Sequence, residues 1–172
     1  NTKLFMLFGV AEDHDSNPIK TGLGRLKERG AKTIAVNPVR TGYNAVADEW
    51  IGITPGTDGL FVLSLVHELV RTGKVDVEYL ARYTNAAAVV VTQGDPAEMG
   101  LLARDAEGKV MTQSSLRGVV DLGDGRQGQP VFELMVEKYL DPAYAPSAVA
   151  ERCGIPASRI EAIAQELARV AF

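Results

Sequence analysis

The sequence predicts an α/β fold in three layers, with a mainly parallel sheet, a small added hairpin and a C-terminal helical segment. Three observations favour this class. Short apolar runs alternate with segments of helical periodicity in the first half of the chain. Glycine, asparagine or proline follows the first two runs and can end a buried strand. The chain has 172 residues, 46% of them hydrophobic, which is enough to form a core.

The expected elements of the first half follow one another as strand, helix and strand. Residues 4–8 form a continuous apolar run, typical of a strand buried on both faces. A helix begins at Pro18 and ends at Gly30, because proline suits a first helical turn and glycine a helix end. The later elements are strands at 33–36 and 49–53, a buried helix between the turn at 55–58 and Gly73, and a helix at 76–83 with Val77, Leu80 and Ala81 inward.

The second half is expected to be less regular at first and helical at its end. Residues 105–108 carry a hairpin signal, and the glycine-rich stretch 118–129 is interpreted as an exposed loop. Helices are expected at 131–139, 146–152 and 157–171. The predicted organisation is a Rossmann-like core over 1–92, a hairpin and loop insertion over 93–129, and a C-terminal helical segment over 130–172.

Composition argues against several classes of function. The 18 basic and 22 acidic side chains give a net charge of -4, without the basic excess that nucleic-acid binding requires. No apolar stretch approaches the roughly 20 residues of a membrane helix, so we expect a soluble chain without membrane insertion. The single cysteine, Cys153, cannot hold an iron–sulfur cluster alone and is interpreted as a small apolar residue near a helix end.

Three loops that follow predicted strands carry candidate binding residues. In an open parallel sheet, ligands bind outside the carboxyl ends of the strands. The first loop begins at Gly9 and leads to a helix start, where Asp15 and Ser16 suit a sugar or a phosphate. Both residues are equally plausible as simple helix caps.

The second loop contains Asn37, Pro38 and Arg40. The asparagine suits a ribose hydroxyl and the guanidinium a phosphate, although an ordinary exposed arginine is the alternative. The third loop is the turn of Pro55, Gly56 and Asp58. Its carboxylate can accept two hydrogen bonds from the N1 and N2 edge of guanine, and a helix cap is the alternative. The chain has no G-x-G-x-x-G or G-x-x-x-x-G-K-[ST] motif, so the usual nicotinamide and ATP interpretations lack support.

Taken together, several phrases resemble the molybdopterin oxidoreductases related to dimethyl sulfoxide reductase and formate dehydrogenase. These phrases are Asp15-Ser16-Asn17-Pro18, Gly30-Ala31-Lys32, Val36-Asn37-Pro38-Val39-Arg40, Ala47-Asp48-Glu49-Trp50 and Pro55-Gly56-Thr57-Asp58. The resemblance covers nearly the full chain and is weakest over 92–129. It implies a molybdopterin guanine dinucleotide cofactor, in which molybdenum or tungsten is held by two pterin dithiolenes that each carry a guanosine diphosphate.

The resemblance also implies roles for individual residues. The family's aspartate-proline-arginine turn, preceded here by Val36, corresponds to Asn37, Pro38 and Arg40, with Val39 inserted. The proline-glycine-threonine-aspartate turn is intact, which makes Asp58 the expected guanine reader. The loop after Gly9 departs from the family because Ala11 and Glu12 stand where an asparagine is usual.

The same resemblance suggests a domain fragment of a larger catalytic subunit. Its cysteines for an iron–sulfur cluster, its metal ligand and its C-terminal pterin domain have no counterpart in the sequence, so we expect no catalysis by the chain alone. The expected partners are an iron–sulfur electron-transfer subunit and the remaining domains of the same large subunit. Cytoplasmic and periplasmic locations both stay open. A standalone interaction or regulatory module without cofactor is the alternative function, and a free-standing nucleotide-dependent enzyme is a third.

Other polar and aromatic residues are interpreted conservatively. His67 lies in an apolar helical run and is expected in the core, whereas His14 belongs to the first loop. Neither histidine has a nucleophile or carboxylate at a recognisable catalytic spacing. Tyr43 and Trp50 are expected to pack in the core.

Overall fold

The structure is a computed structural model that describes residues 2–9, 18–40 and 42–171. The chain forms two compact units. The first, called here the sheet unit, comprises Asn1–Thr72 and Pro142–Phe172, and the second, the hairpin unit, comprises Gly73–Asp141. The sequence had placed boundaries after residues 92 and 129. The predicted α/β class is confirmed, with a parallel sheet in one unit and an antiparallel sheet in the other.

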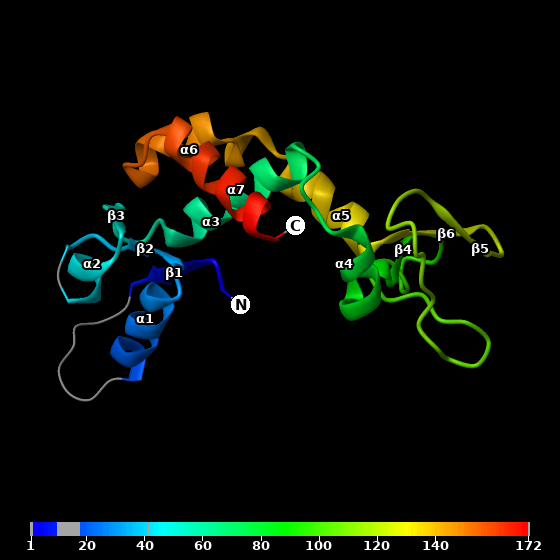
Figure 1. Ribbon diagram of the computed structural model, residues 1–172. Coiled ribbons are helices and arrows are strands. Elements are labelled where there is room, and N and C mark those ends of the chain that lie inside the picture. Colours follow the sequence, from blue (N-terminus) through cyan, green and yellow to red (C-terminus); the bar gives the residue numbers. More distant parts are fainter. Residues whose placement is uncertain (1, 10–17, 41, 172) are drawn as a thin grey trace. The chain divides into compact units, whose positions relative to one another are not determined.

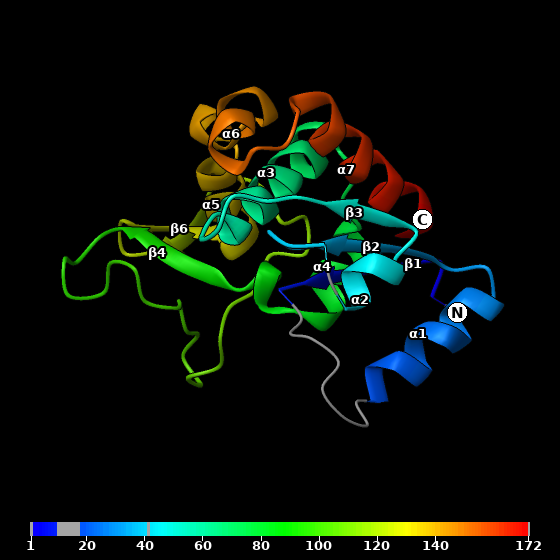
Figure 2. The ribbon, with the colours of Figure 1, turned by 90° about the vertical axis from the view of Figure 1, so that its left-hand side faces the viewer.

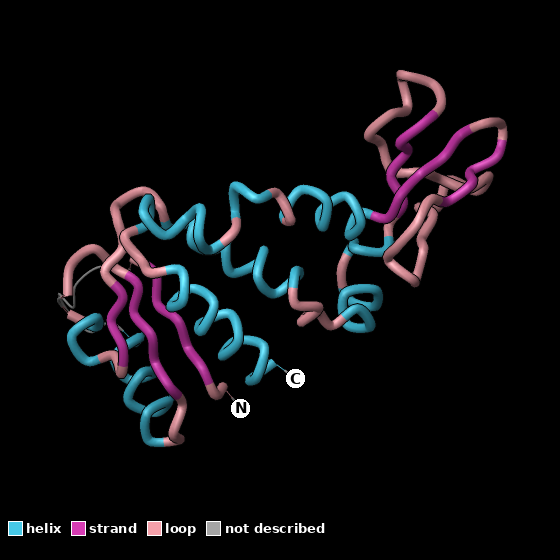
Figure 3. Tube along the Cα trace, turned by 90° about the horizontal axis from the view of Figure 1, so that it is seen from above, coloured by secondary structure: helices cyan, strands magenta, loops and turns pink. Residues whose placement is uncertain are grey.

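The sheet unit is built on three parallel strands. They are β1 (Leu4–Phe8), β2 (Lys32–Val36) and β3 (Glu49–Ile51), in the spatial order β1-β2-β3 (Figure 3). Phe8 lies opposite Val36, and Val36 lies opposite Ile51, so all three strands end at one edge. The strand predictions are confirmed, although β3 is two residues shorter than expected. The chain leaves the sheet there, since the Thr54 amide donates to the carbonyl of Cys153 instead.

Helices cover both faces of this sheet (Figure 2). They are α1 (Pro18–Glu28), α2 (Tyr43–Val46), α3 (Asp58–Arg71), α6 (Pro146–Cys153) and α7 (Ala157–Ala171), with a 3₁₀ turn η2 (Pro142–Tyr144). Strand β2 serves two cores because its side chains alternate. Ile34 and Val36 pack with residues of α3, α6 and α7, while Ala35 packs with Leu23 and Tyr43 on the other face.

The hairpin unit has its own antiparallel sheet (Figure 1). Its strands are β4 (Val89–Gln93), β5 (Val120–Gly123) and β6 (Arg126–Pro130), in the order β4-β6-β5. The helices of this unit are α4 (Val77–Tyr83), η1 (Asn85–Ala87) and α5 (Val131–Tyr139). The hairpin expected around 105–108 is confirmed as an isolated bridge between Arg104 and Val110.

Two sequence predictions for the hairpin unit are wrong. Residues 118–129 were expected to form an exposed loop, but they contain most of the β5–β6 hairpin. Its turn uses Asp124 (φ 54°) and Gly125 (φ 76°), the left-handed conformations that an Asp-Gly hairpin turn requires. Val77 was expected to face inward, yet it is 43% exposed. Asp76 caps α4 as expected, since its carboxylate accepts from the Tyr79 amide at 2.8 Å.

The helices of the described residues include none that is both long and apolar enough to cross a membrane.

Candidate functional site

The loops predicted to bind a ligand begin at one edge of the parallel sheet. The amide of Gly9, just after β1, donates to the Val36 carbonyl at 3.1 Å. In the same way, the amide of Asn37, just after β2, donates to the Ile51 carbonyl at 3.1 Å. The turn at 55–58 starts four residues beyond the end of β3. The first two loops therefore start side by side, at the carboxyl edge where open parallel sheets bind ligands.

The second loop is held by three side-chain hydrogen bonds. Asn37 Oδ1 accepts from the Val39 amide at 3.1 Å, which closes a short turn. Asn44 Nδ2, from α2, donates to the Val39 carbonyl at 3.3 Å. Trp50 Nε1, from β3, donates to the Asn37 carbonyl at 3.0 Å. Both backbone polar groups of Val39 are thus bound by side chains, which orders the segment that carries Arg40.

The contact from Trp50 depends on the glycine that follows β3. A Cβ atom added to Gly52 would lie 2.9 Å from Cη2 of the indole, closer than real side chains come. A larger residue at this position would push the indole away from the loop. Sequence reasoning assigned Trp50 to packing alone. A partly buried indole N–H needs an acceptor, and that requirement is the signal that would have identified its role.

The third loop is stabilised by its own threonine and by the C-terminal end of α6. Thr57 Oγ1 donates to the Thr54 carbonyl at 2.7 Å. The Thr54 amide donates to the carbonyl of Cys153 at 2.9 Å, and the Cys153 thiol lies 3.7 Å from the Thr57 carbonyl. Cys153 is fully buried at the end of α6, as the sequence predicted. Residues about a hundred positions later in the chain therefore fix the turn ahead of α3.

Asp58 is the first residue of α3, not the residue that caps it. The N-cap is Thr57, whose side chain bonds within the turn and makes no cap hydrogen bond. Within the described part of the chain, neither the Asp58 carboxylate nor the Arg40 guanidinium has a hydrogen bond or an ion pair. Arg40 is exposed and Asp58 is half-buried, so both groups are accessible for a ligand.

The remaining predicted site residues divide into three groups. Gly9, Pro38, Pro55 and Gly56 are exposed along the edge. The side chain of Val36 is fully buried in the larger core, so a ligand contact from this residue would involve its backbone alone. Asp15 and Ser16, together with His14, lie outside the described residues. His67 is buried in α3, at 6% exposure, as expected for a core histidine.

The opposite, amino edge of the same sheet carries paired charges. Lys32, the first residue of β2, contacts Glu166 of α7 at 2.8 Å and Glu49 at 3.3 Å, and Glu49 also binds Arg159. Asp48 Oδ2 accepts from both the hydroxyl and the amide of Thr33 at 2.7 Å. These contacts fasten α7 and the start of β3 to β2.

The partners at the amino edge also alter acid–base behaviour. Hydrogen bonds from the Thr33 hydroxyl and amide, with Lys27 nearby, hold the pKa of Asp48 below its usual range. The hydrogen bond to Glu166, assisted by Glu49, raises the pKa of Lys32. Both shifts favour the charged forms, which is the behaviour of structural ion pairs.

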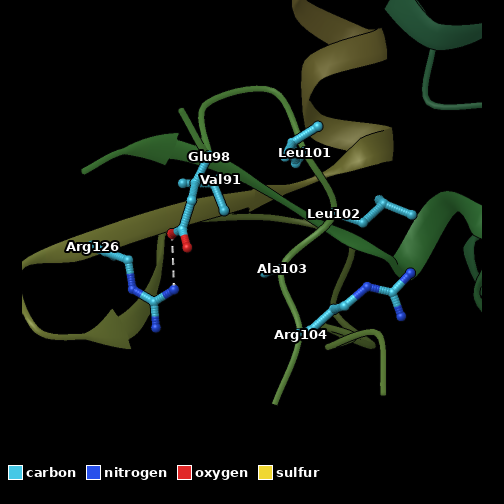
Figure 4. A pocket seen from close by; sticks show the side chains of 7 residues that line it. All are labelled: Val91, Glu98, Leu101, Leu102, Ala103, Arg104 and Arg126. Carbon is cyan, nitrogen blue, oxygen red and sulfur yellow. Dashed lines mark hydrogen bonds and ion pairs between the residues drawn. The ribbon is translucent and has the colours of Figure 1, made fainter. Parts of the chain in front are cut away.

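The hairpin unit has a separate hollow of about 490 Å³ (Figure 4). It is lined by Val91, Glu98, Leu101, Leu102, Ala103, Arg104 and Arg126. Arg126 and Glu98 form an ion pair at 3.0 Å, and Arg104 donates to the Gly108 carbonyl at 2.6 Å. None of the residues predicted to bind a nucleotide lines this hollow, and its arginines already have partners.

Comparisons with known proteins identify relatives that are much longer. No family model matches the chain. A sulfite dehydrogenase of Allochromatium vinosum has a component that is 38% identical over 190 aligned positions, which cover 96% of this chain and 19% of that protein. The nitrate-inducible formate dehydrogenase major subunit of Escherichia coli is 28% identical over 178 positions, which cover 98% of this chain and 17% of that protein.

A solved structure supports the same fold. Acetylene hydratase from Pelobacter acetylenicus matches 95% of this chain and 16% of its own, with a TM-score of 0.61 and 18% sequence identity. The chain therefore spans about a fifth of the length of the curated relatives that it matches over nearly its full extent.

Proposed function

We propose, on the premise that this chain belongs to the molybdopterin oxidoreductase family of catalytic subunits, that its sheet unit binds the guanosine diphosphate end of a molybdopterin guanine dinucleotide. The observation that carries the proposal is the pair of unpartnered charges at the carboxyl edge. Asp58 and Arg40 have no hydrogen bond or ion pair among the described residues, whereas Lys32, Asp48 and Glu49 at the amino edge are all paired.

The residues at this edge fit the chemistry of a guanosine diphosphate. A carboxylate can accept two hydrogen bonds from the N1–H and N2–H groups of guanine, and Asp58 is half-buried in an ordered turn. A guanidinium binds phosphate oxygens in pairs, and Arg40 follows a loop whose backbone is already fixed. Such prior ordering lowers the entropy that binding costs.

The chain's contribution is to bind and orient. Asp58 would read the base, Asn37 and Pro38 would line the ribose region, and Arg40 would hold the phosphates. The bound cofactor would supply two-electron redox chemistry at molybdenum or tungsten. The partners would be an iron–sulfur electron-transfer subunit and the other domains of the catalytic subunit, with the cluster ligands in other segments.

Calorimetric titration of the 172-residue chain with GDP and with ADP tests the proposal. We expect the wild type to bind GDP more tightly than ADP. Asp58→Asn should remove about 10- to 100-fold of this preference, because a hydrogen bond to a charged group contributes about 1.5–3 kcal/mol. Asparagine offers guanine one acceptor and no charge in place of two carboxylate oxygens.

Asp124→Asn is the matched control. It removes one negative charge from a left-handed turn position that asparagine tolerates, and it lies in the hairpin unit. Binding should stay at the wild-type value. Equal GDP affinity in wild type and Asp58→Asn would refute the role of Asp58. A wild type that binds neither nucleotide would instead favour a standalone interaction module without cofactor.

A further inference from the structure

We propose that Asn44 is a positioning residue for the nucleotide loop of residues 37–40, a role that rests on the proposed function and extends it. Asn44 lies in α2 and is only 3% exposed. Its amide nitrogen donates to the Val39 carbonyl at 3.3 Å, one residue before Arg40. The side chain thus connects a buried helix to the segment that carries the expected phosphate ligand.

The other atom of the same amide group shows that stability alone does not account for this asparagine. Asn44 Oδ1 is buried, and no hydrogen-bond partner for it exists among the described residues. A buried acceptor without a partner costs free energy, so an apolar side chain would suit the interior better. What the asparagine provides at this position is the bond to Val39.

The contact from Asn44 is one of three that act on the same short segment. Asn37 binds the Val39 amide, Trp50 binds the Asn37 carbonyl, and Asn44 binds the Val39 carbonyl. Val39 itself is 57% exposed and has no core contact to hold it. Without Asn44, the carbonyl of Val39 would turn to water and the peptide before Arg40 would lose its fixed orientation.

Asn44→Ala in the 172-residue chain tests this role with two readouts. Hydrogen exchange of the Val39 amide should quicken about 10-fold, while the Asn37 amide, bound to the Ile51 carbonyl, exchanges as in wild type. Affinity for GDP and for ADP should fall by the same factor, about 5- to 10-fold, the contribution of one neutral hydrogen bond. The preference for guanine should persist, because Asp58 is untouched.

Ser64→Ala is the matched control. Ser64 Oγ is the other buried side-chain atom without a partner in the described part of the chain, and it lies within α3. Removing it deletes the same kind of unsatisfied oxygen away from the loop. Val39 exchange and nucleotide affinity should remain at wild-type values. Asn44→Asp, which keeps the side-chain shape but cannot donate at neutral pH, should reproduce the loss in Asn44→Ala.

The outcomes separate this role from the proposed function. Wild-type exchange at Val39 in both Asn44 variants, or an equal change in Ser64→Ala, would overturn the role of Asn44. If the wild type binds no guanine nucleotide, the proposed function fails. The exchange rates then still decide whether Asn44 orders the loop.

Discussion

The two edges of the parallel sheet differ in how they use charge. At the amino edge, Lys32, Glu49 and Arg159 bind one another, and Asp48 is occupied by Thr33. At the carboxyl edge, the described residues offer Asp58 and Arg40 no partner, although the loops around them are fixed by hydrogen bonds. The contrast distinguishes charges that hold the fold from charges that are available to a ligand.

The core between the two edges should matter most for stability, since both depend on it. Phe61 is fully buried in the larger core, and its amide donates to Thr57 beside the third loop. Phe61→Ala should lower the free energy of unfolding by about 3–5 kcal/mol, the usual loss when a buried phenylalanine is truncated. Urea denaturation measures it. A loss under about 1 kcal/mol would contradict the packing described for α3.

Asp48 should give the next largest effect. In Asp48→Ala the amide of Thr33, a residue only 1% exposed, loses its acceptor, which should cost about 1–2 kcal/mol after allowance for a partly exposed carboxylate. Because folding lowers the pKa of Asp48, its stabilisation is present above the unfolded-state pKa of about 3.9 and is lost as pH falls through the lower folded value.

Denaturation between pH 7 and pH 3 measures this dependence. Asp48→Asn should weaken the acid-induced loss of stability, while Asp124→Asn in the hairpin turn should leave it unchanged. An identical acid profile in wild type and Asp48→Asn would mean that the Thr33 hydrogen bonds do not favour the ionised carboxylate.

The smallest effect on stability is expected at the carboxyl edge. Asp58→Asn and Arg40→Gln should each change the free energy of unfolding by less than about 0.5 kcal/mol, as is usual for accessible side chains without partners. Glu49→Gln should cost more, because it weakens contacts with both Lys32 and Arg159. Thermal denaturation of the three variants compares the edges directly, and a larger loss in Asp58→Asn than in Glu49→Gln would erase the distinction.

The regular elements could be predicted from local pattern. The apolar run at 4–8 and the helical stripe at 157–171 match β1 and α7 in the structure. The β5–β6 hairpin was missed because glycine and polar residues were taken as loop signals, although Asp124-Gly125 is itself a hairpin signal. Polar residues on the solvent side of a short strand weaken the alternation that reveals it.

The predicted binding residues could be placed at strand ends, but their supports could not. Asn44 and Cys153 hold the second and third loops through contacts between segments that only the fold brings together. Trp50 reaches back 13 positions to the Asn37 carbonyl. A sequence pattern shows which residues follow a strand, whereas the hydrogen bonds that fix a loop depend on tertiary packing.

Titration of the isotope-labelled chain with GDP, followed by backbone amide chemical shifts, tests the central claim most directly. Binding at the carboxyl edge predicts that the largest shifts occur at Gly9, Val39, Arg40, Gly56 and Asp58, with Lys32 and Glu49 at the amino edge unchanged. Shifts confined to the amino edge or to the hollow around Arg126, or no shifts at saturating GDP, would contradict it.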